Sequence, residues 1–211
     1  MKGKRNVSKI VLGAALLAVA LFSLYPFVYM VLVSLTQSKS MHIRFESGVN
    51  LINYERVFKN FDFLMYFKNS AVVAICACFF NALISAMAAY GFAKKRFPGR
   101  EGLFFLYLAT MMVPSQVTII PVFIIMKGMN LLNSYTALFL PLINAFGVFL
   151  IRQFLLGLPD DLLEAARIDG AGEMRIFAIV VLPLIKSALI SLTVFTFINS
   201  WNDFIWPLII A

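Results

Sequence analysis

The chain alternates between long apolar stretches and short polar ones. Five stretches contain no Asp, Glu, Lys or Arg, namely residues 10–34, 70–93, 102–126, 135–151 and 187–202. Uncharged apolar runs close to the length of a bilayer crossing predict transmembrane helices, because about 20 helical residues cross the hydrocarbon core. We therefore predict an all-α fold, a polytopic membrane helical bundle with five spans.

The overall composition supports a membrane protein and argues against a soluble core. Hydrophobic residues make up 62% of the 211 residues and charged residues only 13%. The mean hydropathy is +0.90, far above the balance of soluble domains. The first apolar run follows a basic start, as in a signal peptide, but it is longer than a signal-peptide core and no A-x-A-like cleavage site follows it. We predict that it is retained as the first span.

Positive charge is unevenly distributed among the polar segments. The net charge is +8, and 12 of the 18 Lys and Arg residues lie in the N-terminus, the 94–101 loop and the 152–186 loop. Cytoplasmic loops carry an excess of Lys and Arg, so we predict a multi-pass protein whose N-terminus is cytoplasmic. Five basic residues in segment 35–68 weaken this bias without reversing it. The pattern points to the lipid bilayer as a partner and not to nucleic acid.

The sequence contains neither a proton-coupling group nor an ATP-binding loop. No Asp, Glu, Lys, Arg or His lies deep in any expected span, whereas ion-coupled carriers commonly place ionisable groups there. A G-x-x-x-x-G-K-[ST] phosphate loop is also absent. Cys76 and Cys78 point about 200° apart on a helix, and we predict no metal site, no cofactor and no enzymatic activity. Energy for uphill transport would have to come from another subunit.

Polar side chains inside the expected spans are candidates for a substrate pathway. They are Asn81, Ser115, Gln116, Asn144 and Asn199. Ser115 and Gln116 follow Pro114, in a span that also contains Pro121, and proline removes a helix hydrogen bond and favours a kink. Freed backbone groups at membrane depth need neighbouring protein or a water-filled cavity. A broken, cavity-lining helix and a simple packing kink both fit this pattern.

Two further patterns concern membrane surfaces. Tyr54, Val57, Phe58 and Phe61 recur at helical spacing and predict an amphipathic helix before the second span. Trp201 and Trp206 fit an aromatic belt at a membrane–water boundary.

The 157–183 loop predicts two short helices joined by a glycine turn. Asp161 and Glu164 have the spacing of a capping box, so the first helix is expected over about 162–169, with Gly170 ending it in the left-handed conformation. A second helix is expected from Glu173 to Pro183. The residues expected on one of its faces are Met174, Phe177, Ala178 and Val181. The first helix fits either a rigid docking surface for another protein or an interfacial connector between two spans.

The spacing within this loop resembles a known motif. Residues matching the pattern E-A-A-x3-G-x9-I-x-L-P are Glu164, Ala165, Ala166, Gly170, Leu182 and Pro183, with Val180 at the position of the usual Ile. This is similar to the EAA motif of permease subunits of ATP-binding-cassette (ABC) importers. The segments "MMVPSQVTIIP", "SWNDFIWPLII" and "NYERVFKN" resemble the carbohydrate branch, of the maltose and glycerol-phosphate type.

The resemblance implies a function and a set of partners. It implies the transmembrane domain of a type I ABC importer, with a sixth span expected after the "WNDF" region, in a bacterial or archaeal plasma membrane. The residues expected to couple to the ATPase are Glu164, Ala165, Ala166, Asp169, Gly170, Leu182 and Pro183. The implied partners are a cytoplasmic ABC ATPase dimer, a second homologous permease, an extracytoplasmic solute-binding protein and a sugar.

Two other function classes compete with this interpretation. A secondary carrier or channel would work without ATPase subunits, and a purely structural membrane subunit would need no polar residues along its interior. For domain organisation, we expect a first span with an extracytoplasmic loop over 1–69, and a core permease region over 70–211 that contains the coupling loop 157–183.

Overall fold

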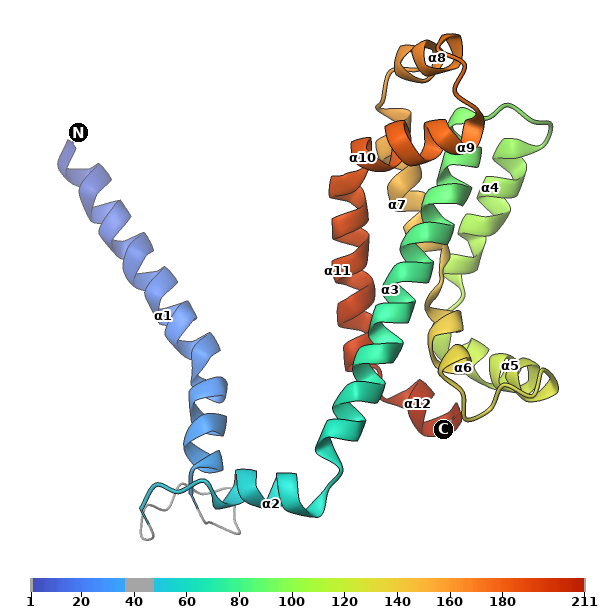
Figure 1. The fold of residues 1–211 in the computed structure, drawn as a ribbon. Coiled ribbons are helices and arrows are strands. Elements are labelled where there is room, and N and C mark those ends of the chain that lie inside the picture. The colour runs from blue at the N-terminus through green and yellow to red at the C-terminus, as the bar shows by residue number, and fades with distance from the viewer. Residues whose placement is uncertain (1, 37–47, 211) are drawn as a thin grey trace. The chain divides into compact units, whose positions relative to one another are not determined.

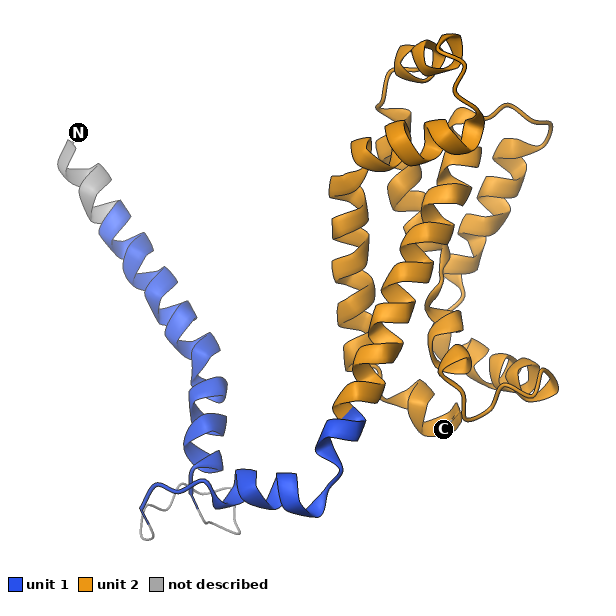
Figure 2. Ribbon diagram, viewed as in Figure 1, with its two compact units in different colours: residues 1–66 blue, residues 67–211 orange. Residues whose placement is uncertain are grey.

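The computed structural model describes the backbone of residues 2–36 and 48–210, and side chains from residue 9 onward. Within these residues the secondary structure is helical, without strands. Contacts divide the chain into two compact units, Met1–Tyr66 and Phe67–Ala211 (Figure 2). The division falls within the third helix, close to the expected boundary between residues 69 and 70.

The first unit contains α1 (Lys2–Ser34) and α2 (Ile52–Asn60). The side chains of α1 that the structure describes are almost all exposed and apolar, as expected for a helix surrounded by lipid. The amide of Asn53 donates to the carbonyl oxygens of Ser34 (3.0 Å) and Thr36 (2.7 Å), so α2 is attached to the end of α1. Helix α2 confirms the predicted amphipathic helix, although Phe61 lies just beyond its last residue.

The second unit is built from the larger part of α3 and twelve further helical segments. In chain order they are α3 (Phe63–Lys94), α4 (Arg100–Ala109), η2 (Thr110–Met112), α5 (Ser115–Gly128), α6 (Tyr135–Phe139), η3 (Leu140–Leu142), α7 (Ala145–Leu156), α8 (Asp161–Ile168), α9 (Glu173–Ile176), η4 (Phe177–Val181), α10 (Leu182–Leu184), α11 (Lys186–Asn202) and α12 (Ile205–Ile210). Helices α3, α4, α7 and α11 run lengthwise, α8 to α10 lie at one end, and α5, α6 and α12 lie at the other (Figure 1).

The number of membrane spans depends on how bent helices are counted. Two described helices, Lys9–Ser34 and Phe63–Lys94, are long and apolar enough to cross a membrane, and three bent pairs raise the number to five. The expected five spans are thus accommodated, but three of them are broken. The largest bend, 104°, separates Arg100–Met112 from Ser115–Gly128.

Proline explains the position of this bend. Pro114 lacks an amide hydrogen and disfavours a helical conformation in the residue before it, and Val113 is accordingly extended (φ −85°, ψ 118°). Pro121, by contrast, lies inside α5, which continues through it. Only one of the two prolines in this span therefore breaks the helix.

The main core joins the lengthwise helices to the end that carries α8. It includes Ala86 and Ala89 of α3, Val148, Ile151 and Leu155 of α7, and Ile176, Val181, Ile185 and Leu192 near and along α11. Small residues allow close approach of α3 and α7, as in many membrane helix pairs. A Cβ atom on Gly147 would lie 2.2 Å from the Oγ atom of Ser85, so these two helices meet where no larger residue fits.

A second, smaller core lies at the opposite end of the unit. It contains Met126, Ala137, Trp206 and Ile210. The indole nitrogen of Trp206 donates to the carbonyl oxygen of Ala137 at 2.8 Å. The prediction that Trp206 belongs to an aromatic belt is therefore wrong, because burial and this hydrogen bond fix its ring inside the protein. Trp201 remains partly exposed and stacks on Phe197.

Candidate functional site: helix α8 and its attachment

Helix α8 lies at one end of the second unit, between α7 and α9 (Figure 1). It begins at Asp161, with Asp161 and Glu164 in its first turn and Arg167 in its last, an arrangement that complements the helix dipole. The predicted capping box is wrong. Asp160 is the N-cap, its backbone is already helical, and no side chain caps the free amides. The carboxylate of Asp160 pairs with Lys94 instead.

The end of α8 follows the prediction. The helix ends at Ile168, and Gly170 adopts a left-handed conformation with φ +77°. The amide of Ala171 donates to the carbonyl oxygen of Ala166 at 3.0 Å, which satisfies a carbonyl that the helix end would otherwise leave free. Gly170 thus turns the chain back toward α9.

The two faces of α8 differ in their surroundings. Leu163 is buried in the main core and Ala166 packs against it. Glu164, Ala165 and Asp169 are exposed on the remaining surface. Ile168 is 86% exposed there, at the end of the unit that carries the charged loops. The two motif alanines therefore differ, because Ala165 is available to a partner while Ala166 supports the helix from beneath.

Lys94, at the C-terminal end of α3, attaches the start of the α8 segment. Its ammonium group donates to the Asp160 carboxylate at 2.6 Å and to the carbonyl oxygen of Leu158 at 2.7 Å. The Lys94 side chain is only 5% exposed, so its stem is packed and its charged end is directed at these two acceptors. The Asp160 pKa is lowered, mainly by the hydrogen bond from Lys94.

Glu173, the first residue of α9, attaches the end of the α8 segment. Its carboxylate forms an ion pair with Lys95, accepts a hydrogen bond from the Tyr90 hydroxyl at 2.8 Å, and accepts another from Arg167 at 3.3 Å. These groups lower the Glu173 pKa to about 2, with the Lys95 hydrogen bond as the largest cause and the Tyr90 hydrogen bond next. Glu173 is thus held as a carboxylate at every physiological pH.

Arg152 of α7 joins three helices just beneath this attachment. Its guanidinium donates twice to the Glu101 carboxylate, at 3.0 Å each, and to the carbonyl oxygen of Phe92 at 3.3 Å. It also lies 4.0 Å from the centre of the Phe104 ring. A paired, stacked arginine of this kind is geometrically specific, so α3, α4 and α7 are fixed to one another at the α8 end.

The segment after α9 departs from the expected second helix. Residues Phe177–Val181 form a π-helical stretch, which changes the register of the buried face. The buried residues are Ile176, Phe177 and Val181, whereas Met174 and Ala178 are exposed. Of the four residues predicted to share one face, two are therefore buried and two are exposed. The prediction assumed a regular helix with 3.6 residues per turn, which the π-helical stretch interrupts. The helix ends just after Pro183, where a 76° bend leads into α11.

The five candidate pathway residues do not form one cluster. Asn81 is fully buried, where it donates to Thr196 at 2.9 Å and accepts from Ser85 at 3.1 Å. Asn144 caps α7 by accepting from the amide of Gly147 at 3.4 Å. Gln116 and Asn199 are exposed on α5 and α11. Among the described residues, none of the five is hydrogen-bonded to another.

Ser115 lines a cavity of about 390 Å³ at the end opposite α8. Its other walls include Thr118, Pro141, Asp203 and Trp206. The Asp203 carboxylate also caps α12 by accepting from the Trp206 amide at 3.3 Å. The walls are mostly apolar, with the Ser115 and Thr118 hydroxyls and the Asp203 carboxylate as polar groups, which is the usual composition of a small-molecule site.

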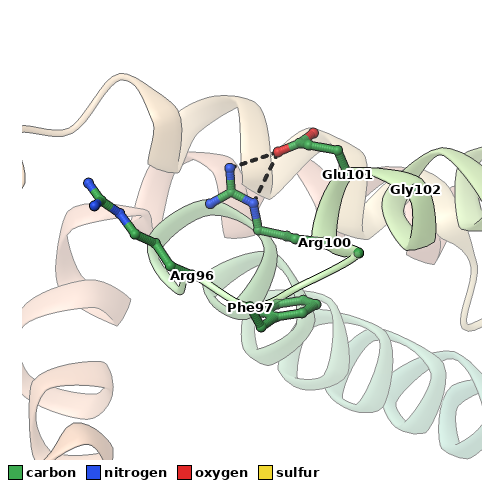
Figure 3. Close-up of a pocket in the computed structure, with 6 residues that line it drawn as sticks. Arg96, Phe97, Arg100, Glu101 and Gly102 are labelled. Carbon is green, nitrogen blue, oxygen red and sulfur yellow. Dashed lines mark hydrogen bonds and ion pairs between the residues drawn. The ribbon is translucent and has the colours of Figure 1, made fainter.

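A second hollow, of about 430 Å³, lies at the turn between α3 and α4. Arg96 and Arg100 extend from this turn in different directions, and Arg100 bonds to Glu101 (Figure 3). Because Glu101 also pairs with Arg152, the one carboxylate here is shared between two guanidinium groups. This hollow belongs to the same basic, α8-bearing end of the unit.

Sequence reasoning missed the residues that attach α8. The sequence placed Lys94 and Lys95 in a basic loop and Glu173 at the start of a helix, but it did not predict their ion pairs, because these join residues far apart in sequence. A signal existed in the two consecutive lysines at the end of a span, opposite a loop with acidic residues at both ends. Ile168 was also missed, although an apolar residue among charged neighbours at a helix end is unusual.

Comparison with known proteins gives this geometry a context. Residues 81–211 match the family described as the binding-protein-dependent transport system inner membrane component. The sn-glycerol-3-phosphate transport system permease protein UgpE of Yersinia pestis is 47% identical over 144 residues, which cover 68% of this chain and 51% of the relative. The chain thus spans about half the length of such relatives.

Two more relatives cover nearly all of the chain. The arabinooligosaccharides transport system permease protein AraQ of Bacillus subtilis is 37% identical over 216 residues, covering 97% of this chain and 76% of the relative. The crystal structure of a bacterial ABC transporter involved in the import of the acidic polysaccharide alginate has a chain with a TM-score of 0.85 and 26% identity, covering 97% of this chain and 74% of that one. The helical bundle and the sequence agree, and the chain belongs to the family of binding-protein-dependent transport system inner membrane components.

Proposed function

We propose that the chain is a transmembrane permease subunit of an ATP-driven, binding-protein-dependent carbohydrate importer, in which it forms half of the translocation pathway. The observation that carries this proposal is α8, a short helix that presents Glu164, Ala165 and Ile168 outward while its other face is held on the core. A connector between two spans needs no such rigid, exposed surface. Family membership supports the same function.

In this proposal α8 is the coupling helix that docks on a cytoplasmic ABC ATPase. The small side chain of Ala165 allows close approach of the ATPase, and Ile168 makes an apolar contact with it. Glu164 and Asp169 make polar contacts around these two residues. Gly170 permits the turn, while Leu182 and Pro183 mark the bend that leads into α11. When two ATPase subunits close on ATP, α8 moves with them. Switching a two-state bundle almost completely requires about 5.5 kcal/mol of differential binding, so a loosely held helix would be inadequate.

The other partners follow from the importer type. A second, homologous permease provides the other half of the pathway, and an extracytoplasmic binding protein delivers the sugar. The α8 end then faces the cytoplasm, as does the N-terminus, and the end with α5, α6 and α12 faces outward. The basic loops at the α8 end support this orientation.

The substrate class rests on the relatives and on one cavity. Relatives named for sn-glycerol-3-phosphate and arabinooligosaccharides suggest a carbohydrate or its phosphate. The cavity lined by Ser115, Asp203 and Trp206 offers polar and aromatic groups suited to a sugar. Gln116, Asn144 and Asn199 remain pathway candidates on exposed surfaces, whereas the contribution of Asn81 is to hold α3 against α11.

The energy source of transport distinguishes an ATP-driven importer from a secondary carrier or a channel. Cells with the complete transporter would be tested for uptake of radiolabelled sn-glycerol-3-phosphate and arabinooligosaccharides, with ATP depleted or with the membrane potential dissipated by an ionophore. We expect uptake to depend on ATP and to be lost in Ala165→Arg at unchanged membrane insertion. The control Val49→Arg alters an exposed residue of the first unit and should retain uptake. Uptake that survives Ala165→Arg and ATP depletion but not the ionophore would establish the carrier instead.

A further inference from the structure

Two consecutive lysines at the C-terminal end of α3 hold the two ends of the α8 segment. Lys94 bonds to Asp160 and to the carbonyl oxygen of Leu158, immediately before α8. Lys95 pairs with Glu173, the first residue after the turn that follows α8. Lys94 and Lys95 with these partners form the lysine anchor.

The chain on either side of α8 is well suited to bending. Gly157 precedes the attachment of Lys94, while Gly170 and Gly172 lie between α8 and Glu173. Glycine backbones have wide conformational freedom, so the covalent connections alone do not fix the direction of α8. Leu163 holds the helix to the core through apolar contact, which is non-directional. Directional bonds between this segment and α3 come from the lysine anchor and from Tyr90, which donates to Glu173.

We propose that Lys94 and Lys95 are positioning residues that make α8 and α3 move as one body. This rests on the proposed function in one respect, that the force on α8 comes from an ATPase. Attachment at two points prevents rotation about either one. Displacement of α8 is then delivered to α3, and through Arg152 to α4 and α7.

The charges at this place favour attachment to α3 in particular. The C-terminal end of a helix carries partial negative charge, which stabilises basic side chains there. Tyr90, one turn before Lys94, adds a hydroxyl bond to the same Glu173 oxygen that Lys95 contacts. Arg167 joins Glu173 to the last turn of α8. Glu173 therefore links α3, α8 and α9 through one carboxylate.

Hydrogen exchange on the purified chain in detergent tests the anchor without any partner. In Lys94→Met and Lys95→Met the apolar stem is kept and the charge is lost. We expect exchange of the α8 amides to become about fivefold faster in each, as for a loss of about 1 kcal/mol in local stability. Lys95→Arg keeps the ion pair and should match the parent. Lys186→Met, which removes a lysine with no ion pair among the described residues, is the matched control.

The complete transporter then tests the consequence for coupling. We expect Lys94→Met and Lys95→Met to retain the bound ATPase and ATP hydrolysis, while the amount of sugar transported per ATP falls at least about fivefold. A merely structural role would reduce hydrolysis and transport together. Parent-like exchange in both lysine variants, or an unchanged ratio of transport to hydrolysis, would overturn the anchor. Absence of any ATPase from the parent would overturn the proposed function, and the exchange measurement would still decide whether the anchor fixes α8.

Discussion

Glu173 is the residue whose charge state most directly reports the attachment of α8. Its pKa in the folded protein is about 2, lowered from 4.5 chiefly by the hydrogen bonds from Lys95 and Tyr90. A lowered folded pKa stabilises the protein fully above the unfolded value, and this stabilisation is lost as the pH falls through the folded value. The contribution of Glu173 should thus fade between about pH 5 and pH 2.

The prediction is a pH-dependent difference between the parent and Glu173→Gln. Thermal unfolding of both, followed by circular dichroism in detergent, should show the parent more stable at pH 7 and the two converging toward pH 3. Using the difference removes the effect of other carboxylates. A constant difference over this range would mean that the Glu173 charge contributes nothing to stability.

The close approach of α3 and α7 can be tested by adding a single carbon atom at Gly147. In Gly147→Ala the new Cβ would lie 2.2 Å from Ser85 Oγ, 3.0 Å from Ser85 Cβ and 3.1 Å from Leu192 Cδ2. Overpacking of this kind costs about 1–3 kcal/mol, so we expect a lower midpoint of thermal unfolding. Gly91→Ala is the matched control, since nothing lies within 4 Å of its new Cβ. Equal midpoints for both variants would contradict the packing described here.

At the scale of the elements, the stability of α8 depends on the turn that ends it. Gly170 has φ +77°, and a residue with a Cβ pays about 1–2 kcal/mol in the left-handed region. Gly170→Ala should therefore loosen the last turn and speed exchange of the α8 amides about fivefold or more. Gly172→Ala is the control, because φ is −69° there. If Gly172→Ala had the larger effect, the turn would not be what holds the end of α8.

Which elements could be predicted from sequence depended on how local their causes are. The turn at Gly170 and the amphipathic α2 follow from single residues or short spacings, and the sequence was sufficient. A kink in the third span was also predicted, but the sequence did not distinguish Pro114, which breaks the helix, from Pro121, which does not. The capping box of Asp161 and Glu164 failed because the N-cap is Asp160, one residue earlier, and Lys94, distant in sequence, holds the Asp160 carboxylate in an ion pair. The face of the helix after Glu173 failed because a π-helical stretch over Phe177–Val181 shifts the register, and tertiary packing decides that shift.

For the whole molecule, the pattern of apolar runs predicted the helical bundle, but it did not predict which side chains face inward and which are exposed. Charge-free runs predicted which segments lie in the membrane, and the spacing of the motif predicted a docking role for α8. Neither showed that Ala166 packs inward, that Asn81 is enclosed between α3 and α11, or that Trp206 is buried. These depend on which helix faces which neighbour, and a single sequence does not encode that in any local pattern.

The central claim is that α8 transmits force from an ATPase to the bundle, and cross-linking at its most exposed residue tests it most directly. A photo-reactive amino acid would replace Ile168, which is 86% exposed, in cells that express the complete transporter. The account predicts a covalent adduct with a P-loop ATPase, identified by mass spectrometry, and no such adduct from the same group at Val49, exposed in the first unit. Adducts only with lipid at Ile168, in a protein that still imports its substrate, would contradict the account.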